Sequence, residues 1–322
     1  MSIIITKIVA VITAIITFVS GGLVNVFDKL ELDTAAGYRA RVSELEFYEN
    51  SLESAVPQTV IYDVISEHMN SKGEKEKKAI IIGYDGGRID GTIYRAENGA
   101  INTMLANGAL AYMGYCGGRN YPHFTVQATS TAPGWCSIIT GKWGNETGVT
   151  DNSIPKSNDN LTLLTTLIQN GKAEKTAFYT SWSGHFSGDD STYINEVAYC
   201  KEKGINAAFV RCSDDSETVS KTISDLSSEN CSDFILSILE YPDHAGHDTG
   251  FSTFNPDYQK GMYDADVSAK SIIDAIKARE NYENEDWLII LTSDHGGFFT
   301  GHGGLTLQER MTFIVMNKQI EW

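Results

Sequence analysis

The sequence predicts an α/β protein with a doubly wound, mostly parallel sheet and helices on both faces, preceded by an N-terminal transmembrane helix. From residue 79 onward, short β-branched or aromatic runs alternate with helical patterns, which is typical of this fold class. The runs are apolar at consecutive positions, as strands buried on both faces are. Residues 8–27 contain no charged side chain and are long enough to cross a bilayer core as a helix.

Six apolar runs are predicted strands: AIIIGY (79–84), TAFYTSW (176–182), AAFVRC (207–212), DFILSILEY (233–241), DWLIILTS (286–293) and MTFIVMN (311–317). Three stretches between them have helical patterns: LTLLTTLIQNG (161–171), INEVAYCKEKG (194–204) and DADVSAKSIIDAIKARE (264–280). Residues 29–70 also have helical patterns, with His68 expected at the surface, and SKGEKEKK (71–78) is typical of a linker. We therefore expect a membrane anchor or signal sequence (1–27), a helical stalk with a charged linker (28–78) and an α/β domain (79–322).

The uncharged N-terminal run is expected to act as a single-pass anchor in the cell membrane. Lys7 precedes it and acidic residues follow it, so the positive-inside rule leaves the α/β domain outside the cytoplasm. The apolar run continues past SGG (20–22), which favours an uncleaved anchor over a signal peptide. Cleavage there would instead make the protein secreted.

The overall composition limits the possible partners. A net charge of −17, from 25 Lys+Arg and 42 Asp+Glu, argues against a nucleic-acid partner because little basic surface is left to contact phosphates. The five cysteines have no CxxC spacing and do not form a metal knuckle. We expect most of them to be buried free thiols, although one pair could be bridged in an exported protein.

Metal-ligand residues recur at the ends of the predicted strands. In chain order they are Asp85 in IIIGYDGG, Asp243 and His247 in YPDHAGH, Asp294 and His295 in LTSDHGG, and His302 in TGHGG. The carboxyl ends of the strands form the ligand crevice of an open α/β sheet, so these side chains should meet at one edge. Any single Asp-His pair could simply cap a strand end, but the whole set is typical of a two-metal hydrolytic site.

The ligand types favour zinc, because carboxylate oxygen and imidazole nitrogen suit that ion and leave positions open for substrate. Manganese or another divalent ion could occupy the same ligands. Thr131, in TSTAPGW, precedes Ala-Pro and could be an ordinary helix N-cap. It could also be a nucleophile at a helix N-terminus that binds phosphate, and both roles are compatible.

Taken together, the motifs resemble those of a known family. GYDGGR, TAPGWCSIITGKWGNETGVTDN, PDHAGH and SDHGG with the following GHGG are similar to the alkaline phosphatase superfamily, and to its nucleotide pyrophosphatase/phosphodiesterase branch in particular. The resemblance covers about residues 79–317. It implies an alkaline-phosphatase-like catalytic domain that cleaves a phosphodiester or pyrophosphate bond through a covalent phospho-threonine.

The resemblance also implies roles for individual residues. One zinc ion would be held by Asp243, His247 and His302, and the other by Asp85, Asp294 and His295 beside the nucleophile Thr131. Asn152 and the Thr131 backbone N–H would donate to a phosphoryl oxygen. The segment Trp182-Ser183-Gly184 would line the substrate pocket, or serve packing alone.

Some positions depart from the nucleotide branch. His302 follows His295 by only seven residues, which is similar to membrane-linked phosphoethanolamine transferases and indicates a reduced or missing cap over the substrate. The sulfatase signature is absent, because Trp135 stands where that family has arginine.

We therefore expect a zinc phosphodiesterase or pyrophosphatase that acts on a phosphate-ester small molecule or on a lipid or glycan head group. A phosphomonoesterase and a phosphoethanolamine-type phosphotransferase remain alternatives, and Arg88 is the candidate cation that a monoesterase would need. The non-enzyme alternative is a metal-bound surface protein that binds a phosphorylated ligand.

Overall fold

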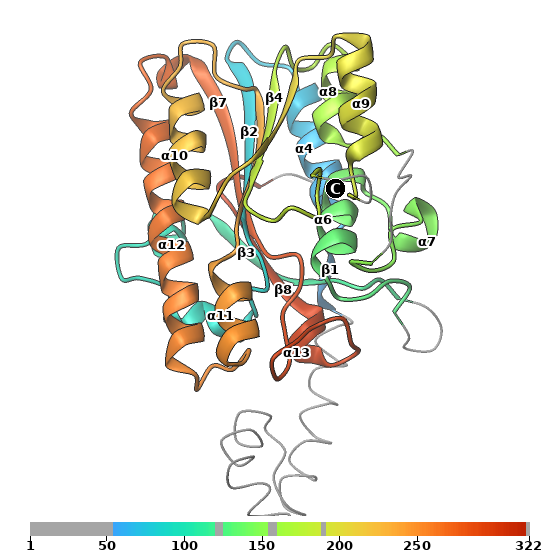
Figure 1. Ribbon diagram of the computed structural model, residues 1–322. Coiled ribbons are helices and arrows are strands. Elements are labelled where there is room, and N and C mark those ends of the chain that lie inside the picture. Colours follow the sequence, from blue (N-terminus) through green and yellow to red (C-terminus); the bar gives the residue numbers. More distant parts are fainter. Residues whose placement is uncertain (1–53, 120–124, 154–159, 188–190, 320–322) are drawn as a thin grey trace, which may run out of the picture.

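The computed structural model describes residues 54–119, 125–153, 160–187 and 191–319 (Figure 1). The predicted membrane segment and residues 28–53 lie outside these ranges. Among the described residues, no helix combines the length and the apolar character that a membrane crossing requires.

Eight strands form one sheet: β1 (Val56–Pro57), β2 (Glu76–Tyr84), β3 (Leu110–Tyr115), β4 (Thr176–Thr180), β5 (Ala207–Arg211), β6 (Phe234–Leu239), β7 (Glu285–Thr292) and β8 (Met311–Met316). The described helices are α4 (Val60–Asn70), α5 (Ala100–Ala106), α6 (Thr131–Thr140), α7 (Gly144–Thr147), α8 (Leu163–Gln169), α9 (Ile194–Lys203), α10 (Asp215–Leu226), α11 (Tyr241–Thr249), α12 (Pro256–Lys277) and α13 (Leu307–Arg310). Two short 3-10 helices are η1 (Asp90–Tyr94) and η2 (Tyr282–Asn284). The six predicted strands and two of the predicted helices are confirmed within a few residues, and the third predicted helix (264–280) is confirmed as α12, which begins eight residues earlier at Pro256.

The strands lie in the order β1-β3-β8-β7-β2-β6-β4-β5 and are parallel except for β8. The expectation that MTFIVMN forms a parallel strand is therefore wrong. The connection from β7 to β8 consists of a loop and the single turn α13 and contains no helix that could return the chain along the sheet, as a parallel crossover usually does. Strand β3 (LAYMGY) was not predicted, although its sequence is apolar, and its side chains are mostly half-buried or exposed.

Both faces of the sheet are buried, which explains the consecutive apolar residues of the central strands. In β2, Ile81 packs into a core with α4, α6 and α8, whereas Ile80 and Ile82 pack into a second core with α5 and α12. Figure 1 shows α4, α6, α8 and α9 on one side of the sheet and α10 and α12 on the other. This is the doubly wound, alkaline-phosphatase-like arrangement that the sequence predicts.

The boundary expected at residue 79 needs a correction. Helix α4, which was assigned to the stalk, buries Ile61, Val64 and Ile65 in the core beside β2 and α6, and β2 itself begins at Glu76. His68 is buried rather than on the surface. Its Nε2 lies 2.8 Å from the carbonyl oxygen of Asp286 and 3.1 Å from that of Lys78. The described part of the 28–78 range thus belongs to the sheet domain.

Candidate metal centre

Three adjacent strands, in the order β7-β2-β6, deliver the predicted ligands to one edge of the sheet. Asp85 directly follows β2, Asp243 lies in the first turn of α11 after β6, and Asp294 and His295 follow β7. His302 comes from the loop between β7 and α13. The arrangement agrees with the expectation that parallel strands bring these side chains to a common crevice.

The first group surrounds Thr131. Single ligand atoms of Asp85, Asp294 and His295 all lie within 4.8 Å of one another, and all three residues are fully buried. The Thr131 Oγ1 atom lies 3.4 Å from Oδ1 of Asp85 and 3.3 Å from Nε2 of His295. A hydroxyl therefore stands beside a trio of potential metal ligands.

The second group adjoins the first. Ligand atoms of Asp243, His295 and His302 also lie within 4.8 Å of one another. His247 Nε2 is 3.4 Å from Oδ2 of Asp243, and its Nδ1 is 3.0 Å from the carbonyl oxygen of Thr300. His247 is half-exposed, so it stands at the solvent side of this group.

The carboxyl groups at this edge are too deeply buried and too close together for all of them to be ionised without a compensating positive charge. Burial and the charge of Asp85 raise the pKa of Asp294 well above its ordinary value, and the same causes raise the pKa of Asp243 to about 7. Burial also opposes ionisation of Asp85, but hydrogen bonds from His295 and Trp135 lower its pKa. Burial disfavours a charged His295, yet Asp294 and Asp85 raise its pKa to about 10. A bound cation would relieve this excess of negative charge.

Unpartnered atoms fit the same interpretation. Asp243 Oδ1, Asp294 Oδ2 and His302 Nδ1 are buried and have no hydrogen-bond partner among the residues that the structure describes. Buried polar atoms are normally paired, so these three atoms are available as ligands of a metal ion. Carboxylate oxygens and imidazole nitrogens are suitable ligands for a divalent transition metal. The residues present thus fit a divalent metal, with Asp85, Asp294 and His295 grouped as the sequence implies, whereas His247 belongs to none of the groups of ligand atoms among the described residues.

Thr131 is the first residue of α6, and Ser130 is the N-cap, so the sequence prediction was off by one position. The first N–H groups of a helix lack partners within the helix and can bind an anion. One of them, the Ala132 N–H, donates to Oδ1 of Asn152 over 2.8 Å. Asn152 is thereby held beside the nucleophile candidate, as its predicted role requires.

Two glycines let the segments that carry the candidate ligands approach closely. Gly86 has a φ of 65°, and a Cβ there would lie 2.8 Å from Oδ1 of Asp243. A Cβ at Gly134, one turn into α6, would lie 2.9 Å from the Asp294 carbonyl oxygen. Side chains at these positions would push the ligands apart.

Two neighbours of the metal centre were not predicted. Trp135 donates its indole N–H to Oδ2 of Asp85 over 2.8 Å. Glu240, the last residue before α11, is fully buried, and its carboxylate falls into a group with Asp85 and Asp243. Burial and the charge of Asp85 raise the pKa of Glu240 well above its ordinary value. The sequence contained a signal for Glu240, because it is a charged residue at the end of an apolar run. No local pattern predicted the contact of Trp135 with Asp85.

Arg88 is not placed as a monoesterase would need it. Its guanidinium donates to both carboxylate oxygens of Asp90 and, over 2.8 Å, to the carbonyl oxygen of Phe251. Trp182 is half-buried and lies edge-on to His185, with 4.8 Å between ring centroids. This contact supports a packing role, and a pocket-lining role for Trp182 stays a prediction.

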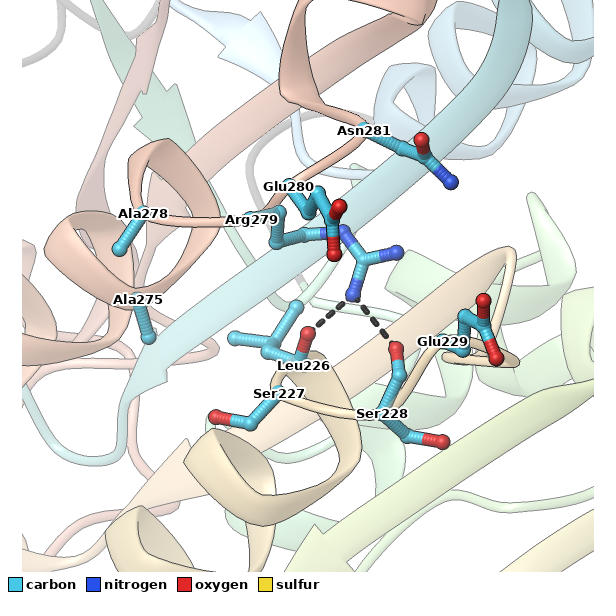
Figure 2. A pocket seen from close by; sticks show the side chains of 9 residues that line it. All are labelled: Leu226, Ser227, Ser228, Glu229, Ala275, Ala278, Arg279, Glu280 and Asn281. Atoms are coloured by element: carbon cyan, nitrogen blue, oxygen red, sulfur yellow. Dashed lines mark hydrogen bonds between the residues drawn. The ribbon is translucent and has the colours of Figure 1, made fainter.

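A cavity of about 450 Å³ lies elsewhere, between the C-terminal ends of α10 and α12 (Figure 2). Arg279 crosses it, donating to the carbonyl oxygens of Leu226 and Ser228 and to the carboxylate of Glu285. The cavity is at the amino ends of β6 and β7, the edge opposite the metal centre. The charge of Arg279 is already neutralised by Glu285, so this cavity is not a candidate active site.

The fold and these residues define an alkaline-phosphatase-like protein of the nucleotide pyrophosphatase type. The pattern of the type I phosphodiesterase/nucleotide pyrophosphatase family matches residues 79–300, about two thirds of the sequence, and the chain belongs to this family. No curated protein matches the chain by sequence.

Similar solved structures share the fold. Murine ectonucleotide pyrophosphatase/phosphodiesterase 5 has a TM-score of 0.50 and 18% identity, over 68% of this chain and 57% of that one. An inactive variant of the murine protein, in complex with AMP, has the same TM-score and identity over 69% and 57%. A Bacteroides thetaiotaomicron protein provisionally assigned as a sulfatase has a TM-score of 0.51 and 12% identity, over 75% and 64%. The chain thus spans a little over half the length of the murine protein.

Proposed function

We propose that this protein is a divalent-metal phosphohydrolase that cleaves a phosphodiester or pyrophosphate bond through a covalent phosphoryl group on Thr131. The observation that carries the proposal is the position of the Thr131 hydroxyl, 3.4 Å from Asp85 and 3.3 Å from His295 at the N-terminus of α6. Family membership supports the same reaction class.

The candidate ligands divide into two sites. Asp85, Asp294 and His295 would hold the ion beside Thr131, and Asp243, His247 and His302 would hold the other. Zinc is the ion we expect, because the ligands are mixed carboxylate and imidazole. When bound, two such ions lower the pKa of a nearby hydroxyl and neutralise charge on the transferred phosphoryl group.

The chain's own groups supply the remaining chemistry. Thr131 Oγ1 forms a bond to phosphorus while the bond from phosphorus to the leaving alcohol or phosphate breaks, and the leaving group takes up the proton. Water then attacks phosphorus, which breaks the bond to Oγ1 and restores the threonine. The first N–H groups of α6 and the Asn152 side chain would hold the phosphoryl oxygens.

A diester or pyrophosphate is favoured over a monoester. A monoester carries an additional negative charge near the nucleophile, which an arginine typically balances. Arg88, the candidate for this role, is engaged by Asp90 and by a backbone carbonyl. This engagement supports a substrate with a single charge on the reacting phosphorus.

The test uses the purified full chain loaded with zinc. Rates on bis(p-nitrophenyl) phosphate and on p-nitrophenyl phosphate would be compared for the native protein, Thr131→Ala and Thr131→Ser. We expect faster diester cleavage, a loss of at least about 10³-fold in the alanine variant and partial activity in the serine variant. A monoester preference would refute the substrate class, and full activity of Thr131→Ala would refute the covalent route.

We further propose that residues 8–27 anchor the protein in the cell membrane with the sheet domain outside the cytoplasm. The uncharged run and the charges around it support this orientation. Protease digestion of intact cells should remove the domain, and extraction with alkaline carbonate should leave the protein in the membrane. Release of the intact domain into the medium would instead indicate a cleaved signal.

A further inference from the structure

The three most exposed large apolar side chains of the described residues lie in segments that follow the carboxyl ends of β2, β6 and β7. Ile93 is 64% exposed in η1 after β2, Phe254 is 66% exposed between α11 and α12, and Leu305 is 53% exposed between β7 and α13. Phe299, 44% exposed, lies between the ligands His295 and His302. Exposed apolar groups clustered at one end of a molecule mark a contact surface.

Hydrogen bonds join two of these segments to each other and to the metal centre. The Phe251 N–H donates to the carbonyl oxygen of Phe299 over 2.6 Å, which joins the segment before Phe254 to the turn at Phe299. Phe298 and Gly301 pair across that turn, and the Thr300 carbonyl oxygen lies 3.0 Å from His247 Nδ1. Phe299 itself has a φ of 58°, which is unusual for a bulky residue. The turn thus holds the partly exposed ring of Phe299 beside the metal centre.

The chain also enters the domain at this edge. Val56 and Pro57 of β1 pair with Gly114 and Tyr115, the last residues of β3. Strand β3 runs parallel to β2 and β7, since both β3 and β7 are antiparallel to β8, so its last residues lie at the carboxyl edge. The sequence upstream, which contains the uncharged run 8–27, therefore joins the sheet domain at the edge that carries the metal centre.

From these observations we infer that the metal-centre edge faces a lipid bilayer and that the substrate is the phosphodiester head group of a lipid in that bilayer. The inference rests on the proposed function and names its substrate class. Ile93, Phe254, Phe299 and Leu305 form the contact surface, which we call the apolar rim. A lipid diester carries one charge on its phosphorus and fits a site whose nearest arginine candidate is already engaged.

The contact is apolar rather than electrostatic. The protein has a net charge of −17, so attraction to anionic lipids is not what holds the rim on the surface. A tether alone leaves the domain free to rotate, and the rim supplies the second contact that fixes its orientation. Zwitterionic and anionic vesicles should therefore be bound in the same orientation.

The orientation is tested on the full chain in phosphatidylcholine vesicles that contain nitroxide-labelled lipids. A fluorophore is attached through Phe254→Cys or Leu305→Cys, since the five native cysteines are buried. Val267→Cys is the matched control, because Val267 is an exposed apolar residue (40%) on α12. We expect quenching at 254 and 305 at least about threefold stronger than at 267. Equal quenching at all three positions, or none at any, would overturn the inference.

Substrate class is tested by double substitution of the rim. We expect Phe254→Ser with Leu305→Ser to lower lipid head-group release from phosphatidylcholine or phosphatidylglycerol vesicles by at least about tenfold. The rate on soluble bis(p-nitrophenyl) phosphate should not change, and Val267→Ser should change neither rate. Equal loss on both substrates, or no loss on vesicles, would refute the lipid substrate.

The two proposals can fail separately. Absence of any esterase activity, with strong quenching at the rim, would refute the proposed function and the lipid substrate but would keep the orientation. Sedimentation could show a concentration-dependent dimer, and the rim residues could be protected only by this self-association. That result would overturn the bilayer contact in favour of a second copy of the chain.

Discussion

The indole N–H of Trp135 donates a 2.8 Å hydrogen bond to Oδ2 of Asp85, and both residues are fully buried. The other carboxylate oxygen of Asp85 is the one that lies near Thr131 and His295. Trp135 therefore fixes which oxygen of Asp85 faces the metal centre. It does so from the same helix that begins with Thr131.

Trp135→Phe should weaken metal binding without removing the catalytic groups. Partners that orient metal ligands typically contribute about 10–100-fold in metal affinity, so we expect a loss of that size, with activity recovered at high zinc. Competition with a chelating dye measures it. Trp287→Phe is the matched control, because Trp287 donates to Glu285 at the opposite end of β7. Equal effects of the two variants on metal affinity would contradict this role of Trp135.

Asn152 is expected to donate to the substrate rather than only to cap α6. Asn152→Ala should lower kcat/KM by about 10²-fold, the usual loss for an oxyanion donor. Asn152→Asp keeps an oxygen for the Ala132 N–H but replaces the donor by a negative charge, so it should lose at least as much. Retention of activity in the aspartate variant would reduce Asn152 to a capping residue. Ser153→Ala, next along the chain and exposed, is the control.

Separate substitutions should remove the two ions one at a time. Asp294→Ala is expected to abolish binding of the ion beside Thr131, and His247→Ala to weaken the other. Mass spectrometry of the native protein counts the bound ions, and His244→Ala, exposed on α11, is the control. Metal removal from the native protein should lower the free energy of unfolding by about 3–4 kcal/mol for each ion at metal concentrations of 100–1,000 times Kd. Two ions retained in both variants would refute the ligand assignment.

Asp215 should make the metal-free protein less stable as the pH rises. Burial is the main cause that raises its pKa to about 7. Between pH 4 and 7 the folded state then keeps a proton that the unfolded state has lost, so the free energy of unfolding falls with increasing pH. A three-unit shift limits this contribution to about 4 kcal/mol.

Asp215→Asn tests this directly, because the amide oxygen can still accept the Glu240 N–H, which donates to Asp215 over 2.8 Å. In urea unfolding with a chelator present, the variant should gain stability over the native protein at pH 8 but not at pH 4. Asp214→Asn, adjacent and exposed, is the control. A constant difference at both pH values would disprove the pKa shift.

The sequence by itself determined six of the eight strands, the α/β class and the edge at which the ligands gather. Buried strands leave continuous apolar runs, and a polar residue that ends such a run must lie at a strand end, as Asp85 and Asp294 do. Buried free thiols were expected for most of the five cysteines, and all five are buried and free.

Only the tertiary structure decided the strand order, the reversed direction of β8 and the place of α4 in the core. It also decided that Trp135 supports Asp85, that Glu240 joins the acidic group and that Asp90 engages Arg88. A local pattern reports which face of an element is apolar, but not which element covers that face. The contact between Trp135 and Asp85 joins positions 50 residues apart, and it exists only because packing brings α6 against the end of β2.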